Sequence, residues 1–433
     1  MKKNKAYENL QGINPQTGEC LPGLFQEATE TTVNMACEAA ASAALVFSSI
    51  VPQERARLIR EIANNIMALG DNLISLTEKE TGLPRGRLVA ERGRTINQLH
   101  MFSELLEEGS WVNARIDIAD VSREPLPKPD VRSMLRPIGP VAVFGASNFP
   151  LAFSVAGGDS VSALAGGNPV VVKAHPAHPG TSALIADAVE KSIESASLPR
   201  GIFSLLHGKK PDVSIALACH PAIKAVGFTG SLRVGRALYD AAASRAEPIP
   251  VYAEMGSVNP IVVLSDALAT RCDSIAQGLS QSMTLGVGQF CTKPGVVLVE
   301  GNANVLIDAL VAELEPMDAG TMLSASLNEN YQKGLDRLQA VKGVKPMFRK
   351  SSDIGLGRSQ AMASVMTCNH DVFLQHPELS EEVFGPVTLI VNCEDRNAIM
   401  QIVNNFPGQL TATVHGTDVD LNNISPLLDA LGR

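Results

Sequence analysis

The sequence predicts an α/β protein made of two doubly wound open-sheet domains. Segments with the patterns of strands and of helices alternate along the chain from Pro140 to Val387–Cys393. Several predicted strands, such as Val141–Phe144 and Val170–Lys173 before its terminal lysine, are continuous apolar runs, as parallel strands buried on both faces are. The chain has 433 residues, which is enough for two large α/β lobes. Right-handed crossovers between parallel strands then place helices on both faces of each sheet.

The chain before the first sheet is predicted to be helical and to end in an extended arm. Apolar residues at helical spacing predict helices over residues 24–49, 53–80 and 87–108. Pro52 suits the first turn of the second helix, and we assign the alternating charges of the third helix to a solvent-facing side. Residues 114–136 are polar and rich in proline, so we expect an arm or hairpin that makes subunit contacts in a homo-oligomer.

Two groups of elements follow this arm. The first group has predicted strands at Val141–Phe144, Val170–Lys173, 201–206 and 225–228, and helices at 153–165, 181–195 and Pro211–Cys219. The second group has predicted strands at 260–264, Val296–Glu300 and Val387–Cys393, and helices at 269–285 and 304–314. A break over residues 251–257 separates the two groups, so we place the domain boundary after residue 256.

The composition excludes several classes of function. A net charge of −9 does not suit a nucleic-acid surface or an anionic membrane, because both bind basic proteins. The apolar stretch 36–51 is too short to span a bilayer, and the N-terminal lysines are not followed by the apolar core of a signal peptide. The seven cysteines show neither disulfide nor metal-site spacing, so we expect a cytoplasmic protein with reduced thiols and no bound metal.

Cys291 is the candidate nucleophile. It follows a predicted helix and a turn that contains Gly286 and Gly288. A glycine-rich backbone can present a thiol at a turn, with peptide N–H groups near its sulfur. The alternative is that Cys291 is a small buried apolar residue, as most cysteines of intracellular proteins are.

A glycine turn indicates a site for a dinucleotide. Gly230 and Gly235 form a Gly-x-x-x-x-Gly pattern between the predicted strand 225–228 and a helix. Such glycines let the backbone approach a pyrophosphate, and the helix N-terminus supplies N–H donors. The pattern lacks the usual Gly-x-Gly-x-x-Gly, so a plain strand–helix turn is an equal alternative.

Three polar side chains lie where predicted strands end, which is the usual place for ligands in open α/β sheets. Asn148 can donate to a developing oxyanion, or it can simply form a turn. Lys173 can bind a ribose hydroxyl or a phosphate, or it can be the solvated end of a strand. Glu254 can act as a general base in a partly buried position, or it can be a capping or ion-paired residue.

Together these features resemble the aldehyde dehydrogenase superfamily over nearly the whole chain, from about Asn14 onward. The motifs that carry the resemblance are Gly-Gln-Phe-Cys-Thr at 288–292, Phe-Thr-Gly-Ser at 228–231 and Glu-Glu-Val-Phe-Gly-Pro at 381–386. The resemblance implies a cofactor-binding domain over residues 1–256, with an oligomerisation arm at 114–136. It implies a catalytic domain over residues 257–433.

The resemblance also implies a role for each candidate residue. Cys291 would be the nucleophile, Glu254 the general base and Asn148 the oxyanion donor. The other candidates would lie at the cofactor: Lys173 and Glu382 at its riboses and Ser231 at its pyrophosphate, with His175, Gly230, Gly235 and Phe384 in the same site.

Two departures from the family pattern bear on substrate and cofactor. The usual Glu-Leu-Gly-Gly-Lys is here Glu-Met-Gly-Ser-Val at 254–258. This is similar to the branch that contains α-ketoglutaric semialdehyde dehydrogenases and an NADP-dependent fatty aldehyde dehydrogenase. Pro176 stands where many NAD-preferring members carry a glutamate that would repel a 2′-phosphate. With Lys173 and His175 nearby, this favours NADP, and NAD is the alternative.

We therefore expect an enzyme that oxidises an aldehyde to a carboxylic acid through a thioester on Cys291. The first expected substrate is 2,5-dioxopentanoate (α-ketoglutarate semialdehyde), which would give 2-oxoglutarate, and the second is a long-chain aldehyde. A CoA-acylating relative would not need Glu254, and a non-catalytic relative would not need to keep both Glu254 and Cys291.

The end of the chain carries a further expectation. Members of the family continue past the point that matches residues 427–433, so we expect this chain to be a fragment without the family's C-terminal tail, with impaired oligomerisation and low turnover. A naturally shorter chain is the alternative. In such a fragment, Leu427, Leu428 and Leu431 of an apparent helix at 425–433 would have few partners.

Overall fold

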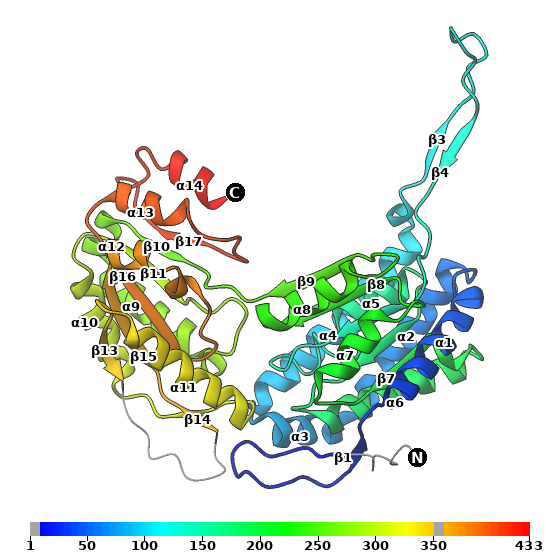
Figure 1. Cartoon of the computed structure of the whole chain (residues 1–433), viewed down its shortest axis with the longest axis horizontal. Helices are drawn as coiled ribbons and strands as arrows, with labels where there is room; N and C mark the ends of the chain where they lie inside the picture. Colours follow the sequence, from blue (N-terminus) through cyan, green and yellow to red (C-terminus); the bar gives the residue numbers. More distant parts are fainter. Residues whose placement is uncertain (1–8, 350–358) are drawn as a thin grey trace. The chain divides into compact units, whose positions relative to one another are not determined.

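The computed structural model describes residues 9–349 and 359–433 and divides the chain into two compact units (Figure 1). Unit 1 comprises Met1–Ile13 and Cys20–Met255, and unit 2 comprises Asn14–Glu19 and Gly256–Arg433. The two-unit, open-sheet α/β fold predicted from the sequence is confirmed.

The sheet of unit 1 has five parallel strands in the order β7-β6-β5-β8-β9. The strands are β5 (Val141–Phe144), β6 (Val170–Lys173), β7 (Phe203–Leu206), β8 (Ala225–Gly230) and β9 (Val251–Met255). The chain runs from β5 outward through β6 to β7, and then returns to place β8 on the other side of β5. This reversal makes the carboxyl ends of β5 and β8 a topological switch point, where open α/β sheets bind ligands.

The break predicted over residues 251–257 contains the division between the two units, which falls between Met255 and Gly256. These residues begin with β9, in which Glu254 pairs with Thr229 of β8. Half-buried and exposed residues alternate along β9, whereas β5 and β6 are almost fully buried. The sequence of β9 therefore lacks the continuous apolar run of a strand buried on both faces.

The helices of unit 1 lie around this sheet and before it in the chain. They are α1 (Glu30–Phe47), α2 (Pro52–Ala68), α3 (Gly70–Thr81), α4 (Arg85–Glu108), α5 (Gly158–Ala165), α6 (Pro179–Ser195), α7 (Pro211–Cys219) and α8 (Leu232–Ala243), with short 3₁₀ turns η1 (Ser110–Val112) and η2 (Arg200–Ile202).

Three predicted helices differ clearly in extent from the structure. The helix predicted over 24–49 begins only at Glu30, because Phe25–Gln26 pair as a short strand, β2. The helix predicted over 53–80 is divided into α2 and α3 at Gly70, whose φ of 56° a right-handed helix cannot contain. The helix predicted over 153–165 begins only at Gly158. Before it the chain folds back on itself so closely that a Cβ on Gly157 would lie 2.5 Å from the carbonyl oxygen of Ala152.

Residues 114–136 contain the expected hairpin, formed by β3 (Arg115–Asp117) and β4 (Val131–Ser133) in antiparallel pairing (Figure 1). Apolar side chains along it are exposed, including Ile118 at 72% and Val121 at 84%. A second short pair, β1 (Asn9–Leu10) with β2 (Phe25–Gln26), lies near the start of the chain.

The sheet of unit 2 has six strands in the order β13-β15-β16-β11-β10-β17, and β13 alone among them is antiparallel to its neighbour. The strands are β10 (Ile261–Val263), β11 (Val296–Glu300), β13 (Lys345–Arg349), β15 (Ser364–Asn369), β16 (Val387–Cys393) and β17 (Thr413–His415), and β12 (Gly320–Thr321) pairs separately with β14 (Gln360–Ala361).

The helices of unit 2 pack on both faces of this sheet, as its two buried apolar clusters show. They are α9 (Ser265–Thr284), α10 (Ala303–Leu314), α11 (Ala325–Ala340), α12 (His370–Gln375), α13 (Arg396–Val403) and α14 (Ser425–Leu431), with the 3₁₀ turns η3 (Leu285–Gly288) and η4 (Pro377–Ser380). No element is predicted from the sequence for residues 315–386, although α11, β13, β15 and α12 lie there.

The apolar stripe of α14 has more partners than expected. Leu427 is 1% exposed within the apolar cluster of unit 2, and Leu431 packs against the same cluster. Of the three leucines, Leu428 alone, at 49% exposed, lies largely in solvent. Among the described residues, no helix is both long and apolar enough to cross a membrane.

Candidate active site

Cys291 follows a turn of unusual backbone geometry in unit 2. Gly286, Val287 and Gly288 all have positive φ, at 56°, 59° and 64°. A Cβ on Gly288 would lie 2.3 Å from the carbonyl carbon of Gly385, so only glycine fits there. Positive φ at Val287 is rare for a β-branched residue and costs ~1–3 kcal/mol. The turn leaves Cys291 half-buried.

Asn259 holds the backbone at Cys291 and two residues beyond it. Its Nδ2 donates to the carbonyl oxygens of Cys291 at 2.8 Å and Lys293 at 3.0 Å. Its Oδ1 accepts from the hydroxyls of Ser257 and Thr411, each at 3.0 Å. From the sequence, Asn259 is only the residue that follows the Glu-Met-Gly-Ser-Val segment, and it has no predicted role. Its positive φ of 45°, which asparagine tolerates better than most residues, is a feature that only the structure reveals.

Lys293 joins the cysteine loop to the 381–386 motif. Its side chain is 2% exposed, and its Nζ donates to the carbonyl oxygens of Val383 at 3.1 Å and Val387 at 3.0 Å. Burial lowers the pKa of Lys293 to about 8, and the nearby charge of Glu382 opposes that shift. Gln289 secures the other side of the loop, because its Oε1 accepts from the N–H of Leu323 at 3.0 Å.

Glu382 and Phe384 are half-buried in the same unit as Cys291. A Cβ on Gly256, whose φ is 52°, would lie 2.7 Å from a carboxylate oxygen of Glu382. Gly385 packs against the ring of Tyr331, whose hydroxyl donates to the carbonyl oxygen of Met362 at 2.7 Å. The structure therefore brings the cysteine loop and the 381–386 motif together.

Asn148 lies in unit 1, in the loop that follows β5, and is 8% exposed. A guanidinium nitrogen of Arg87 in α4 donates to its carbonyl oxygen. Glu91, one turn further along α4, accepts from the N–H groups of Leu151 at 2.8 Å and Ala152 at 3.0 Å. The solvent-facing assignment for the charges of this helix is wrong for Glu91, which is 5% exposed and binds the loop that carries Asn148.

Lys173 ends β6, His175 follows it, and both lie close to further histidines. Burial lowers the pKa of Lys173 to about 8, with Glu27 opposing the shift. Burial, together with His178 and Lys173, lowers the pKa of His175 well below its ordinary value. Burial also lowers the pKa of His178 to about 4. At neutral pH, Lys173 is therefore the main cation of this group, and His175 is neutral.

The glycine turn leads from β8 into α8 as predicted. The hydroxyl of Ser231 makes no capping bond to the helix, and Ser231 is exposed. Gly235 is buried, and a Cβ there would lie 2.4 Å from Cγ of Met255, so the first turn of α8 lies close against β9. A strand that ends at Gly230 and leads into an exposed helix N-terminus fits the pyrophosphate of a dinucleotide.

Glu254 is exposed in β9, so the expected partial burial of this residue is wrong. Its strand neighbour Thr229 immediately precedes Gly230, which places Glu254 beside the glycine turn. The predicted residues thus divide between the units: Cys291, Glu382 and Phe384 lie in unit 2, and Asn148, Lys173, His175, Gly230, Ser231, Gly235 and Glu254 lie in unit 1.

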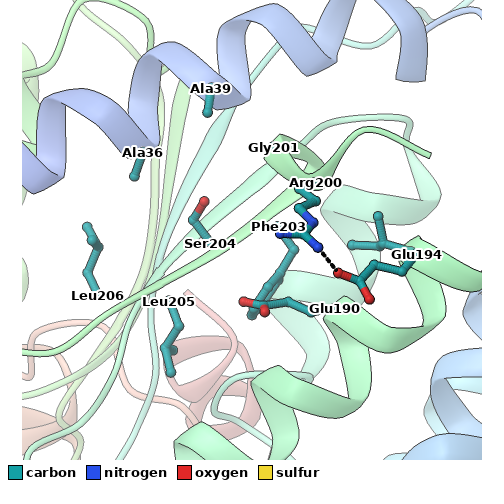
Figure 2. Close-up of a pocket in the computed structure, with 11 residues that line it drawn as sticks. Ala36, Ala39, Glu190, Glu194, Arg200, Gly201, Phe203, Ser204, Leu205 and Leu206 are labelled. Carbon is teal, nitrogen blue, oxygen red and sulfur yellow. Dashed lines mark ion pairs between the residues drawn. The ribbon is translucent and has the colours of Figure 1, made fainter. Parts of the chain in front are cut away.

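A cavity of about 330 Å³ lies between α1, α6 and β7 of unit 1 (Figure 2). Its lining includes Phe203 and Leu206 and an exposed ion pair between Arg200 and Glu194 at 2.6 Å. None of the predicted site residues lines this cavity. The described part of the chain also contains no group of three or more His, Cys, Asp or Glu side chains that could hold a metal ion.

Comparisons with known proteins place this geometry in a family. The model of the "Aldehyde dehydrogenase family" matches residues 1–425. The chain is 44% identical over 432 residues to alpha-ketoglutaric semialdehyde dehydrogenase 2 of Azospirillum brasilense, covering 98% of this chain and 81% of the relative. It is 40% identical over 427 residues to alpha-ketoglutaric semialdehyde dehydrogenase of Acinetobacter baylyi, covering 98% of this chain and 80% of the relative.

Solved structures have the same fold. HpcC of Thermus thermophilus superposes with a TM-score of 0.83 at 22% identity, covering 98% of this chain and 81% of that one. A salicylaldehyde dehydrogenase of Pseudomonas putida superposes with a TM-score of 0.81 at 21% identity, covering 98% and 84%. The chain belongs to the aldehyde dehydrogenase family, whose members oxidise aldehydes with NAD(P).

Proposed function

We propose that this chain oxidises 2,5-dioxopentanoate (α-ketoglutarate semialdehyde) to 2-oxoglutarate. The observation that carries the proposal is the 44% and 40% identity, over 98% of the chain, to two enzymes named for that substrate. The loop geometry around Cys291 and the hydrogen bonds of Asn259 support it, because they hold a half-buried thiol in a defined position.

Three residues would perform the covalent steps. The thiolate of Cys291 attacks the aldehyde carbon, and the oxyanion is held by the side-chain amide of Asn148 and the N–H of Cys291. When bound, the nicotinamide supplies the acceptor for the hydride that leaves the substrate. A thioester on Cys291 remains, and Glu254 takes a proton from the water that hydrolyses it. The exposure of Glu254 gives water access to its carboxylate.

The residues that would hold the cofactor lie in both units. In unit 1, Ser231 at the start of α8 would bind the pyrophosphate, between Gly230 and Gly235, and Lys173 with His175 would lie at one ribose. In unit 2, Glu382 would bind the other ribose, with Phe384 beside it.

We propose that NADP is used at least as well as NAD. Pro176 offers no carboxylate to repel a 2′-phosphate, and Lys173 supplies the cation. The test is kcat/KM for both cofactors in the wild type and in Pro176→Glu, which should shift the preference toward NAD by roughly tenfold, for about 1.4 kcal/mol of repulsion. A wild type that strongly prefers NAD contradicts this proposal.

A long-chain aldehyde is the second candidate substrate. The rings of Phe149 and Phe153 follow Asn148 closely and would pack against an apolar chain. A panel of 2,5-dioxopentanoate, pentanal and a long-chain aldehyde, assayed by absorbance of the reduced cofactor, decides between the candidates. The proposal requires the highest kcat/KM for 2,5-dioxopentanoate.

A further inference from the structure

One face of α4 contacts the loop that carries Asn148. Arg87, Glu91 and Arg94 are spaced four and three residues apart, which places them on the same side of the helix. Arg87 and Glu91 are engaged with the backbone of that loop, at Asn148 and at residues 151–152. Both side chains therefore hold this loop in place.

Arg94, in contrast, makes no hydrogen bond to the backbone of this loop. Its side chain is exposed, and it makes no hydrogen bond or ion pair with any residue in the ranges 9–349 and 359–433. Its guanidinium carbon instead lies 4.8 Å from the ring centroid of Phe153 and 5.6 Å from that of Phe149. These two rings meet edge to face, with centroids 5.1 Å apart. The guanidinium is thus held by aromatic contacts, while its N–H donors have no partner in the described protein.

The charges around Arg94 favour an anion. Arg87 and Arg94 carry two positive charges on this face, against one negative charge on Glu91. Glu91 directs one carboxylate oxygen at the loop N–H groups, and its other oxygen is buried without a hydrogen-bond partner among the described residues. The solvent side of the face therefore presents the cation of Arg94 and not the carboxylate of Glu91.

The position of Arg94 relates it to the substrate. Asn148, the proposed oxyanion donor, immediately precedes Phe149, one of the two rings that hold Arg94. We place the chain of an aldehyde bound at Asn148 beside this aromatic pair, because Phe149 directly follows Asn148. A carboxylate a short chain away from the aldehyde would meet a planar guanidinium that can bind it through two parallel hydrogen bonds. A purely apolar chain would leave the same guanidinium without an anion.

We propose that Arg94 is the specificity-determining residue for a semialdehyde that carries its own carboxylate. Arg94 binds the carboxylate, Phe149 and Phe153 fix the plane of the guanidinium, and Arg87 positions the loop of Asn148. This inference rests on the proposed function and names the residue that selects its substrate.

The test is Arg94→Gln, assayed with 2,5-dioxopentanoate and with pentanal, which has the same number of carbons and no carboxylate. We expect kcat/KM for 2,5-dioxopentanoate to fall about 100-fold, mainly through KM, because a charge-assisted bidentate contact is lost. The loss with pentanal should be at least tenfold smaller. Arg94→Lys keeps the positive charge but lacks the planar pair of N–H donors. Its kcat/KM for 2,5-dioxopentanoate should therefore lie between those of the wild type and Arg94→Gln.

Arg85→Gln is the matched control. Arg85 lies in the first turn of the same helix, is exposed and pairs with Asp71, so its replacement should leave both activities unchanged. A second measurement uses glutarate as a competitive inhibitor of pentanal oxidation, and its inhibition constant should rise about 100-fold in Arg94→Gln.

Each outcome is decisive. Equal losses with both aldehydes, or an unchanged preference and an unchanged glutarate constant, overturn the role of Arg94 and leave the proposed function standing. A wild type that prefers pentanal to 2,5-dioxopentanoate overturns the proposed function and the inference together. The role of Arg94 is supported if Arg94→Gln loses activity selectively with 2,5-dioxopentanoate, if Arg94→Lys restores part of that activity, and if glutarate inhibits Arg94→Gln more weakly than the wild type.

Discussion

Cys291 acts in the formation of the proposed thioester, and Glu254 acts in its hydrolysis. Replacing each residue should therefore block a different step of the reaction. Cys291→Ala removes the only proposed nucleophile and should lower turnover at least roughly 10³-fold. Cofactor binding, measured by fluorescence titration, should stay within about threefold of the wild type, because the thiol acts only in the covalent steps. Turnover above a few per cent of wild type would exclude Cys291 as the nucleophile.

Glu254→Gln should stall the reaction after the cofactor is reduced. The thioester still forms, but the amide cannot take a proton from the attacking water. Rapid mixing with aldehyde and oxidised cofactor should give a burst of reduced cofactor close to one per site, followed by a slow steady rate. Glu247→Gln, at an exposed glutamate of the same unit that pairs only weakly with Lys224, should show no burst. Unaltered steady turnover in Glu254→Gln removes this residue from the hydrolysis step.

Asn259 shows how a residue can matter without touching the substrate. Asn259→Gly keeps the positive φ accessible but removes both donations to the cysteine loop, each worth about 1 kcal/mol. We expect kcat to fall about tenfold and the reaction rate of Cys291 with a thiol reagent to change with it. Asn259→Ala should lose more, since alanine adds backbone strain at φ 45°. Equal activity in Asn259→Gly and the wild type would show that the loop holds its position without this side chain.

At the level of the secondary-structure elements, the histidine that precedes α6 makes the stability of the fold depend on pH. His178 is fully buried, with ring nitrogens 3.2 Å from the hydroxyl of Ser182 and 3.3 Å from the carbonyl oxygen of Ala146. Burial lowers its pKa to about 4 in the folded chain, against ~6.5 when unfolded. Between these values the unfolded chain binds more protons, so stability falls as the pH drops from about 6.5 toward 4, by up to ~3 kcal/mol.

The check is thermal unfolding of the wild type and of His178→Gln across this pH range. Glutamine does not titrate, so the variant should lose less stability than the wild type on acidification, whatever its stability at neutral pH. Asn97→Gln, at an exposed asparagine of α4 that does not titrate, serves as the control and should follow the wild type. Parallel curves for wild type and His178→Gln would contradict the assignment.

The elements also show where prediction from sequence succeeds. Strands β5, β6, β11 and β16 have the predicted bounds, because continuous apolar runs are an unambiguous signal of burial on both faces. Prediction misses the elements between residues 315 and 386, because α11 and β13 are largely solvated on one side and lack such runs.

The site divides in the same way. The thiol, the amide and the motif residues can be proposed from residue type, spacing and resemblance to the family. Asn259, Lys293 and Glu91 cannot, because each acts on backbone groups distant in sequence, as Glu91 does at residues 151–152. The alternating charges around Glu91 are equally compatible with a solvated helix face, so only the fold reveals that its carboxylate is buried.

For the molecule as a whole, the β3–β4 arm is the surface that we propose to hold copies of this chain together. Its apolar side chains are exposed in the single chain, including Ile118 and Val121. Replacing both by aspartate should lower the solution mass measured by light scattering, without changing the fold of either unit. Met35→Asp, at an exposed position of α1, should leave the mass unchanged. A mass that is the same in the wild type and in the arm variant would exclude the arm as an interface.

The proposed substrate and the proposed role of Arg94 both require that this aldehyde dehydrogenase acts on a short semialdehyde that carries a carboxylate. The decisive measurement is kcat/KM of the wild-type chain for 2,5-dioxopentanoate, with 2-oxoglutarate identified as the product, beside the values for pentanal and a long-chain aldehyde. We expect the value for 2,5-dioxopentanoate to exceed both by at least about tenfold, which corresponds to about 1.4 kcal/mol of transition-state binding. A higher value for the long-chain aldehyde, or no formation of 2-oxoglutarate, would show that the proposed substrate is wrong.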